Sequence, residues 1–395
     1  MRQKIMGAAA ALAVSVAVAA GAPALAAEPL KIGVVLPYAP PFGIYSQSLE
    51  ISMKMAIDEA GGEVAGRKIQ LIIEDDENKP PVAIAKAKKL FLSDKVDVLI
   101  GGLASNLAVP LAPVAIEAKT PYIIVNAGAD DLTGAKCSQW VMRVSFSNDQ
   151  ITRPSAKWLY DKGHKQVYLL TADYRGGRDI VENFKRAFEK VGGKVVGEGY
   201  APFDTKDFGP YLSQAKAAKP DTIYTFFPGG MAIQFVKQYG QFGLQGQIPL
   251  TGPVWTVSPL FVGAQGSAAF GYVGPINYVY TLDIPANKKF VEAFKAKSGG
   301  KVPDEVTVNG YDAINFILAA VKKLNGKTDD KAALAKAIQQ VSYTGPRGPV
   351  RIDPKTNNII QNIYMVEVKD NGGKPDYVIL DTVKDVQDEP NGCKL

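Results

Sequence analysis

The chain contains few residues of the types that most often carry catalysis or bind metals. Its 395 residues include two cysteines and a single histidine, His164. One histidine without a nearby group of cysteines or carboxylates does not make a common zinc site. No Gly-x-Ser-x-Gly segment accompanies it, which argues against a Ser-His-Asp hydrolase. We therefore expect no metal and no cofactor, and we interpret His164 as a surface residue.

The sequence also lacks the usual signs of nucleotide and nucleic-acid binding. The glycine pairs Gly176-Gly177 and Gly229-Gly230 do not have the spacing of a phosphate-binding loop. The 45 Lys and Arg residues against 39 Asp and Glu give a formal charge of +6, without a basic stripe interleaved with aromatic residues. No nucleic-acid partner is expected.

Long apolar runs are missing except at the N-terminus. Arg2 and Lys4 precede an apolar run over 7–20, and Ala24-Leu25-Ala26 places small residues where a signal peptidase reads them. The run is too short to span a bilayer comfortably. We expect 1–26 to be a cleaved signal peptide, whose removal leaves 369 residues and lowers the formal charge from +6 to +4.

The two cysteines, Cys137 and Cys393, belong to a chain that is expected to reach an oxidising compartment. An even number of cysteines in an exported protein favours one disulfide bond between them. Two unrelated thiols are the alternative.

From residue 28 onward, short apolar runs alternate with longer amphipathic stretches. Strands are predicted over 31–36, 69–74, 96–100, 122–125, 166–171, 194–200, 222–226 and 249–252. Helices are predicted between them, including 47–59 and 152–162. This alternation indicates parallel βαβ units, and the length exceeds what one hydrophobic core usually supports. The expected fold class is α/β, with two doubly wound parallel-sheet lobes that face each other across a cleft.

The loops at the carboxyl ends of these strands are the expected binding site, because open parallel sheets bind ligands there. They carry irregular, small and aromatic residues over 37–45, 101–106, 126–130, 172–177, 226–230 and 252–256.

Several segments of the chain, in a fixed order, are similar to those of a known family. They are Ile32-Gly33-Val34-Val35-Leu36-Pro37, Ala56-Ile57-Asp58-Glu59-Ala60-Gly61-Gly62, Gly66-Arg67-Lys68-Ile69, Val98-Leu99-Ile100-Gly101 and Gly345-Pro346-Arg347-Gly348-Pro349. Over essentially its whole mature length the chain resembles the branched-chain amino acid (leucine/isoleucine/valine) binding proteins, which are type I periplasmic binding proteins of ABC transporters. The resemblance implies a monomeric periplasmic solute-binding protein that is not an enzyme and that delivers its ligand to the membrane permease of an ABC importer.

The resemblance also implies three chain crossovers between the lobes, about which the lobes close on the ligand. Residues 28–146 and 276–345 would form the N-terminal lobe, and 147–275 and 346–395 the C-terminal lobe.

In the resembled family, a serine that heads a helix binds the ligand carboxylate, and Ser105 matches that position. A hydroxyl and free N–H groups at a helix N-terminus favour an anion independently of the resemblance, although such a serine can merely cap its own helix. A second backbone contact is expected around Gly128, where a tight turn is the alternative.

One position departs from the family pattern. Amino-acid binders of the family place a Glu after a Gly-Pro pair to meet the ligand ammonium, but here Gly252-Pro253 is followed by Val254 and Trp255. A buried ammonium without its carboxylate is costly, whereas Trp255 offers an aromatic face. We therefore favour a small aromatic carboxylate, benzoate- or cinnamate-like, over a free amino acid. A branched-chain or other amino acid is the alternative if Asp130 replaces the missing Glu.

The residues that we predict to contact the ligand come from several cleft loops. They are Tyr45, Ala104, Ser105, Ala127, Gly128, Tyr174, Arg175, Phe227, Trp255 and Tyr278. Arg175 could add a charge-assisted contact to an anion or could be salt-bridged elsewhere.

Two hypotheses from other functional classes remain. An exported hydrolase could use paired carboxylates such as Asp75-Asp76 or Asp130-Asp131, but the sequence offers no acid and base that face one cleft. A sensory receptor would need a membrane partner that the sequence does not identify.

Overall fold

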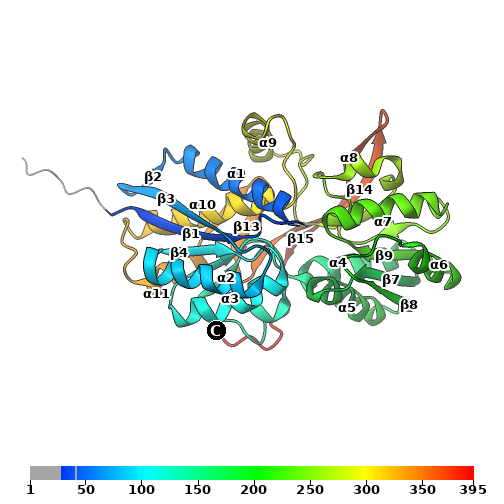
Figure 1. Ribbon diagram of the computed structural model, residues 1–395, viewed down its shortest axis with the longest axis horizontal. Helices are drawn as coiled ribbons and strands as arrows, with labels where there is room; N and C mark the ends of the chain where they lie inside the picture. Colours follow the sequence, from blue (N-terminus) through cyan, green and yellow to red (C-terminus); the bar gives the residue numbers. More distant parts are fainter. Residues whose placement is uncertain (1–27, 41) are drawn as a thin grey trace, which may run out of the picture.

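The protein consists of two α/β lobes, each built on its own sheet (Figure 1). A computed structural model describes residues 28–40 and 42–395. The expected signal peptide, 1–26, lies outside the described residues. Within the described part of the chain, no helix is both long and apolar enough to cross a membrane.

The first sheet has the strand order β2-β3-β1-β4-β5-β6. Its strands are β1 (Leu30–Leu36), β2 (Glu63–Val64), β3 (Arg67–Asp75), β4 (Val98–Gly101), β5 (Tyr122–Ile124) and β6 (Val141–Arg143). All neighbours pair in parallel except β2 and β3. The strands β4, β5 and β6 are buried along their whole length, as expected when helices cover both faces of a parallel sheet.

Helices cover the two faces of the first sheet in different groups. On one face, α1 (Gly43–Glu59) packs against α10 (Thr307–Lys323), and on the other α2 (Pro80–Lys89) packs against α3 (Ser105–Glu117) (Figure 1). Right-handed crossovers account for this division, because the chain moves from β1 to β3 in one direction and from β3 to β4 and β5 in the other. The helices α9 (Pro285–Ser298) and α11 (Lys331–Gln339) complete this lobe.

The second sheet combines a parallel part with an antiparallel part. Its parallel strands are β7 (Gln166–Ala172), β8 (Lys194–Ala201), β9 (Thr222–Phe226), β10 (Leu250–Thr251) and β11 (Val273–Ile276). Its helices are α4 (Asn148–Asp161), α5 (Arg175–Lys190), α6 (Gly209–Ala217), α7 (Gly229–Gln241) and α8 (Val262–Gln265). A long hairpin of β14 (Ile359–Asn371) and β15 (Lys374–Val386) pairs antiparallel with β11. The shorter hairpin β12 (Ser342–Gly345) and β13 (Gly348–Ile352) joins β14 at its start.

The predicted α/β class with two parallel-sheet lobes is confirmed, and each predicted strand is present with ends that differ by a few residues. Helices begin earlier than predicted. The helix expected from residue 47 starts at Gly43, and the one expected from residue 152 starts at Asn148. The first turn of each carries cleft residues rather than the regular amphipathic pattern, so the periodicity appears only after it.

The connections between the lobes are held together by the buried side chain of Arg347. Its guanidinium forms an ion pair with Asp312 of α10 at 2.6 Å, and both side chains are fully buried. It also donates to Gln361 of β14 at 2.7 Å and to the carbonyl of Ser145, which lies between β6 and α4. One cation thus fixes three segments that pass between or border the lobes.

The end of the chain returns to the first lobe (Figure 1). Cys393 forms the expected disulfide bond with Cys137, which precedes β6, with Cα atoms 5.4 Å apart. Asp388 accepts a hydrogen bond from Thr133 of the same lobe at 3.1 Å. Asp388 and Cys393 therefore contact the lobe of the first sheet, while the Gln387 carbonyl accepts a hydrogen bond from Arg153 of α4. The division that groups 346–395 with the other lobe stays a prediction.

Breaking the disulfide bond should lower the free energy of unfolding by about 2–4 kcal/mol, because it frees a long loop in the unfolded chain. Denaturant unfolding with and without reductant measures the difference, and C393A should match the reduced protein and no longer respond to reductant. Two free thiols in protein purified without reductant, or identical unfolding curves, would contradict this expectation.

Candidate functional site

A cavity of about 50 Å³ lies between the lobes, at the carboxyl ends of the parallel strands of both sheets. The residues that line it are Phe42, Tyr45, Leu103, Ala104, Ser105, Asn126, Ala127, Gly128, Phe146, Asn148, Tyr174, Gly176, Ile180, Phe226, Pro228, Trp255, Glu305 and Val306. Its position is the one that the strand pattern predicts.

Aromatic rings form much of the cavity wall. Trp255 stacks on Phe146 with ring centroids 4.3 Å apart, and Phe226 meets the edge of Trp255 at 5.6 Å. Tyr174 lies beside Phe226 at 6.3 Å. Flat rings at these separations favour a flat apolar ligand body, because a further ring can stack or pack edge-on against them.

Two lining side chains carry buried hydrogen-bond donors that no described residue satisfies. They are the indole N–H of Trp255 and the amide nitrogen of Asn148, and both residues are almost fully buried. A buried donor without an acceptor costs about 1–3 kcal/mol. The cavity is therefore prepared to receive acceptor oxygens from a ligand.

The N-terminus of α3 adds further donors at this cavity. Ser105 is the first residue of the helix, and Ala104 before it provides no side-chain cap. Ser105 is 4 % exposed and lines the cavity. The helix dipole and free N–H groups at this end favour a negatively charged group.

Gly128 is required by close packing. A Cβ atom at this position would lie 2.2 Å from Oδ1 of Asn148, and the Asn148 N–H donates to the Gly128 carbonyl at 2.8 Å. Glycine thereby lets the first lobe approach the start of α4 and holds the Asn148 side chain at the cavity. This contact, rather than a tight turn alone, accounts for the residue.

Of the described residues that line the cavity, Glu305 alone carries a carboxyl group, and none carries a cationic side chain. It precedes α10 in the first lobe and is 2 % exposed, and it accepts a hydrogen bond from the hydroxyl of Ser258 in the second lobe at 2.8 Å. Burial, with the neighbouring Asp304 carboxyl, raises the pKa of Glu305 to about 8. An acid is thus present in the cavity although the position after Gly252-Pro253 holds Val254.

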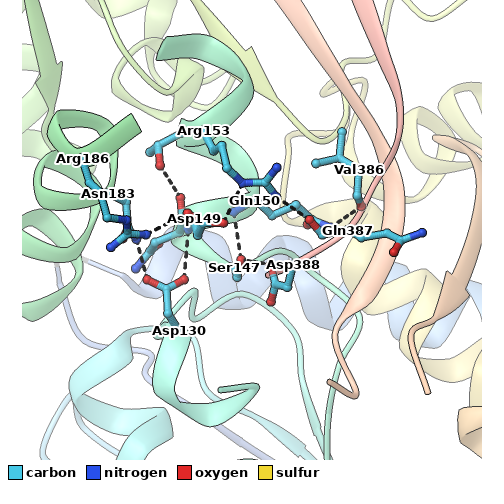
Figure 2. A network of polar contacts seen from close by, with 12 residues as sticks. Asp130, Ser147, Asp149, Gln150, Arg153, Asn183, Arg186, Val386, Gln387 and Asp388 are labelled. Carbon is cyan, nitrogen blue, oxygen red and sulfur yellow. Dashed lines mark hydrogen bonds and ion pairs between the residues drawn. The ribbon is translucent and has the colours of Figure 1, made fainter. Parts of the chain in front are cut away.

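Polar contacts between the lobes close one side of the cleft. Asp130 of the first lobe accepts hydrogen bonds from Asn183 of α5 and, at 2.9 Å, from the Asp149 N–H (Figure 2). Asp131 forms an ion pair with Arg175 at the start of α5 at 3.0 Å. Burial raises the pKa of the Asp130 carboxyl. Asp130 fastens the lobes and does not line the cavity, so it does not take the place of the missing Glu.

Seven of the ten predicted ligand residues line the cavity and three do not. The seven are Tyr45, Ala104, Ser105, Ala127, Gly128, Tyr174 and Trp255. They come from loops after β1, β4, β5, β7 and β10.

The other three lie elsewhere for identifiable reasons. The Arg175 side chain turns to the carboxylates Asp131 and Asp179. Phe227 packs among the aromatic rings inside the second lobe, because alternation along β9 points its neighbour Phe226 to the cavity instead. Tyr278 is fully buried and donates to Asn287 of α9 at 2.8 Å.

The cavity also contains residues that were not predicted, chiefly Glu305, Asn148 and Phe146. Asn148 and Phe146 lie on the first crossover, which the strand pattern does not mark as a cleft loop. Glu305 precedes a helix far along the chain, and its only signal is a carboxyl beside Pro303 and Asp304 ahead of an apolar helix.

The paired carboxylates considered for hydrolysis do not form a catalytic pair. Asp76 is fully buried and accepts from the Asn78 N–H at 2.9 Å, and neither it nor Asp75 lines the cavity. His164 is half-buried rather than a fully exposed surface residue, because it fills the turn between α4 and β7. Among residues 28–40 and 42–395, no group of three His, Cys, Asp or Glu side chains is arranged to hold a metal ion.

Comparison with known proteins gives consistent matches over nearly the whole chain. A sequence profile described as "Periplasmic binding protein" matches residues 29–374. The Leu/Ile/Val-binding protein homolog 6 of Brucella melitensis is 30% identical over 348 residues, which cover 87% of this chain and 88% of that protein.

Solved structures of similar proteins contain aromatic acids. A solute-binding protein of an ABC transporter from Rhodopseudomonas palustris in complex with benzoate is 35% identical, covers 93% of this chain and 100% of its own, and has a TM-score of 0.86. Another from R. palustris in complex with 4-hydroxybenzoate is 31% identical, covers 91% of this chain and 98% of its own, and has a TM-score of 0.84.

Replacing Trp255 with Phe should change the free energy of unfolding of the ligand-free protein by less than about 1 kcal/mol, because losing buried area is offset by removing an unpaired donor. The control is W140F, since Trp140 is comparably buried but has no such unpaired indole N–H. The free energy of unfolding of W140F should be about 1–2 kcal/mol lower than that of the wild-type protein. Denaturant unfolding compares the two, and equal losses would show that the Trp255 donor carries no penalty.

Proposed function

This chain belongs to the periplasmic binding protein family, and we propose that it binds a small aromatic carboxylate, benzoate-like or cinnamate-like, in the cavity between its lobes. The family comprises substrate-binding proteins of ABC transporters and not enzymes. The ligand-contact residues proposed are those of the predicted set that line the cavity, joined by Asn148, Phe146, Phe226 and Glu305.

The main support for the proposal is that two buried donors without a partner lie beside the aromatic rings of the cavity wall. The Asn148 amide and the Trp255 indole N–H both need acceptors, and a carboxylate supplies two oxygens with several lone pairs. The N-terminus of α3 at Ser105 favours the negative charge of that group. The rings of Phe146, Trp255 and Phe226 then suit a flat body attached to it.

A second candidate is a branched-chain or other amino acid. It is favoured by Glu305, a cavity carboxyl that could meet an ammonium group, and by the names of relatives such as the Brucella protein. The aromatic acid is preferred for two reasons. Burial raises the pKa of Glu305, which favours its neutral form, and Val254 occupies the position of the family's usual acid.

Ligand capture by lobe closure follows from the way the cavity is divided. Ser105 and Gly128 come from the first lobe, and Tyr174 and Trp255 from the second, so a ligand can contact all of them only when the lobes are together. A ligand that binds this form better shifts the population toward it. We expect the closed, monomeric protein to be the form that a membrane permease receives in the periplasm.

A thermal-shift screen tests the ligand class. Benzoate, 4-hydroxybenzoate and cinnamate should raise the melting temperature, whereas leucine, isoleucine, valine and phenylalanine should not. At a ligand concentration about 100 times Kd, the stabilisation is about 2.7 kcal/mol, enough for a clear shift. Cyclohexanecarboxylate, an acid of similar size without a flat ring, serves as the control for ring stacking. Stabilisation by the amino acids alone would refute the proposal.

A further inference from the structure

We propose that the side chain of Glu305 is a neutral carboxylic acid when the ligand binds and that this state determines the specificity of the cavity. The protein then selects acids without an ammonium group. This inference rests on the proposed binding of an aromatic carboxylate and assigns the protonation state that such binding requires. It also implies that capture of an anionic ligand is coupled to a proton.

Glu305 and the anion-favouring end of the cavity belong to opposite faces of the first sheet. Ser105 starts α3, which packs with α2 on one face, while Glu305 directly precedes α10, which packs with α1 on the other. Ser105 and Glu305 nevertheless line the same cavity. In the proposed complex, the ligand carboxylate meets Ser105, Asn148 and Trp255, and another side of the ligand lies toward Glu305.

The groups that face Glu305 leave its charge uncompensated. No Lys, Arg or His is among the cavity-lining residues, and within residues 28–40 and 42–395 the only side chain that hydrogen-bonds the Glu305 carboxyl is Ser258. The titratable groups near it are Asp304, Tyr45 of α1 and Tyr377 of β15. Burial raises the pKa of both tyrosines well above the ordinary value, so they stay neutral as well.

Of the two adjacent acids, Asp304 is the better placed to hold a negative charge. Its carboxylate accepts backbone N–H groups of Val306 and Thr307, at 2.9 and 3.0 Å, in the loop that enters α10. Those donors and the helix dipole stabilise the ionised form, whereas the Glu305 carboxylate is stabilised only by the Ser258 hydroxyl and its own backbone N–H. Two adjacent buried carboxyls do not both ionise easily, so the proton resides on Glu305.

The charge of the ligand then decides which state of Glu305 can bind it. An acid such as benzoate brings one negative charge, which an ionised Glu305 in the same dry cavity would repel. An amino acid brings an ammonium that requires Glu305 to be ionised. Affinity for benzoate should fall as the pH rises through the pKa of Glu305, whereas affinity for leucine, if it binds, should rise.

Calorimetric titration with benzoate across about pH 6.5 to 9.5 tests the coupling, because benzoate itself does not titrate in this range. Kd of the wild-type protein should increase about tenfold over the interval. In E305Q, which keeps the shape and cannot ionise, Kd should vary by less than about twofold over the same interval. The control E292Q alters an exposed glutamate of α9 and should keep the wild-type pH profile.

Proton uptake gives an independent readout that needs no variant. At the midpoint of the measured pH profile of Kd, binding of benzoate should take up about half a proton, seen as a dependence of the heat on the ionisation enthalpy of the buffer, and E305Q should take up none. Benzoate binding with no proton uptake and a flat pH profile would overturn the role of Glu305 and leave the proposed function standing. Leucine binding that strengthens with pH, with no benzoate binding at any pH, would overturn both.

Discussion

The buried ion pair of Arg347 and Asp312 holds together the segments that connect the two lobes on either side of the cavity. The same guanidinium donates to Ser145 on the first crossover and to Gln361 on the β14–β15 hairpin, so it ties α10 to two connections between the lobes. Gln361 in turn donates to the side chain of Gln150 in α4 at 2.8 Å. Removing one partner of such a pair would leave a buried charge uncompensated, which is strongly destabilising. The hinge is therefore stiff where it is packed, and the strand ends of the two sheets are held facing each other.

That arrangement produces a cavity in which two buried donors have no partner within the described protein. The unpaired donors of Asn148 and Trp255 each reduce stability when no ligand is present. Sites of this kind are expected where function rather than folding decides the residue. The aromatic rings around them contribute packing without further polar demands, which leaves the recognition of charge to a few groups at the two ends.

Sequence reasoning predicts the scaffold well and the site only in part. Alternating apolar runs place β1, β4, β5, β7 and β10, and the segments after them contain Tyr45, Ser105, Gly128, Tyr174 and Trp255. Finer placement depends on which way each side chain points, and there the pattern is insufficient. Phe226, the last residue of β9, lines the cavity, whereas the next residue, Phe227, packs inside the second lobe. Arg175 pairs with Asp131 of the first lobe and with Asp179 of its own helix. The sequence pattern does not predict that Glu305 lies at the cleft, because the packing of α10 against α1 brings it there.

Small-angle X-ray scattering tests most directly whether the two lobes close around an aromatic acid. Scattering from the protein should show a smaller radius of gyration with saturating benzoate than without ligand, and no change with the same concentration of leucine. A radius of gyration that is unchanged by benzoate at saturation, or that decreases with leucine alone, would contradict the account.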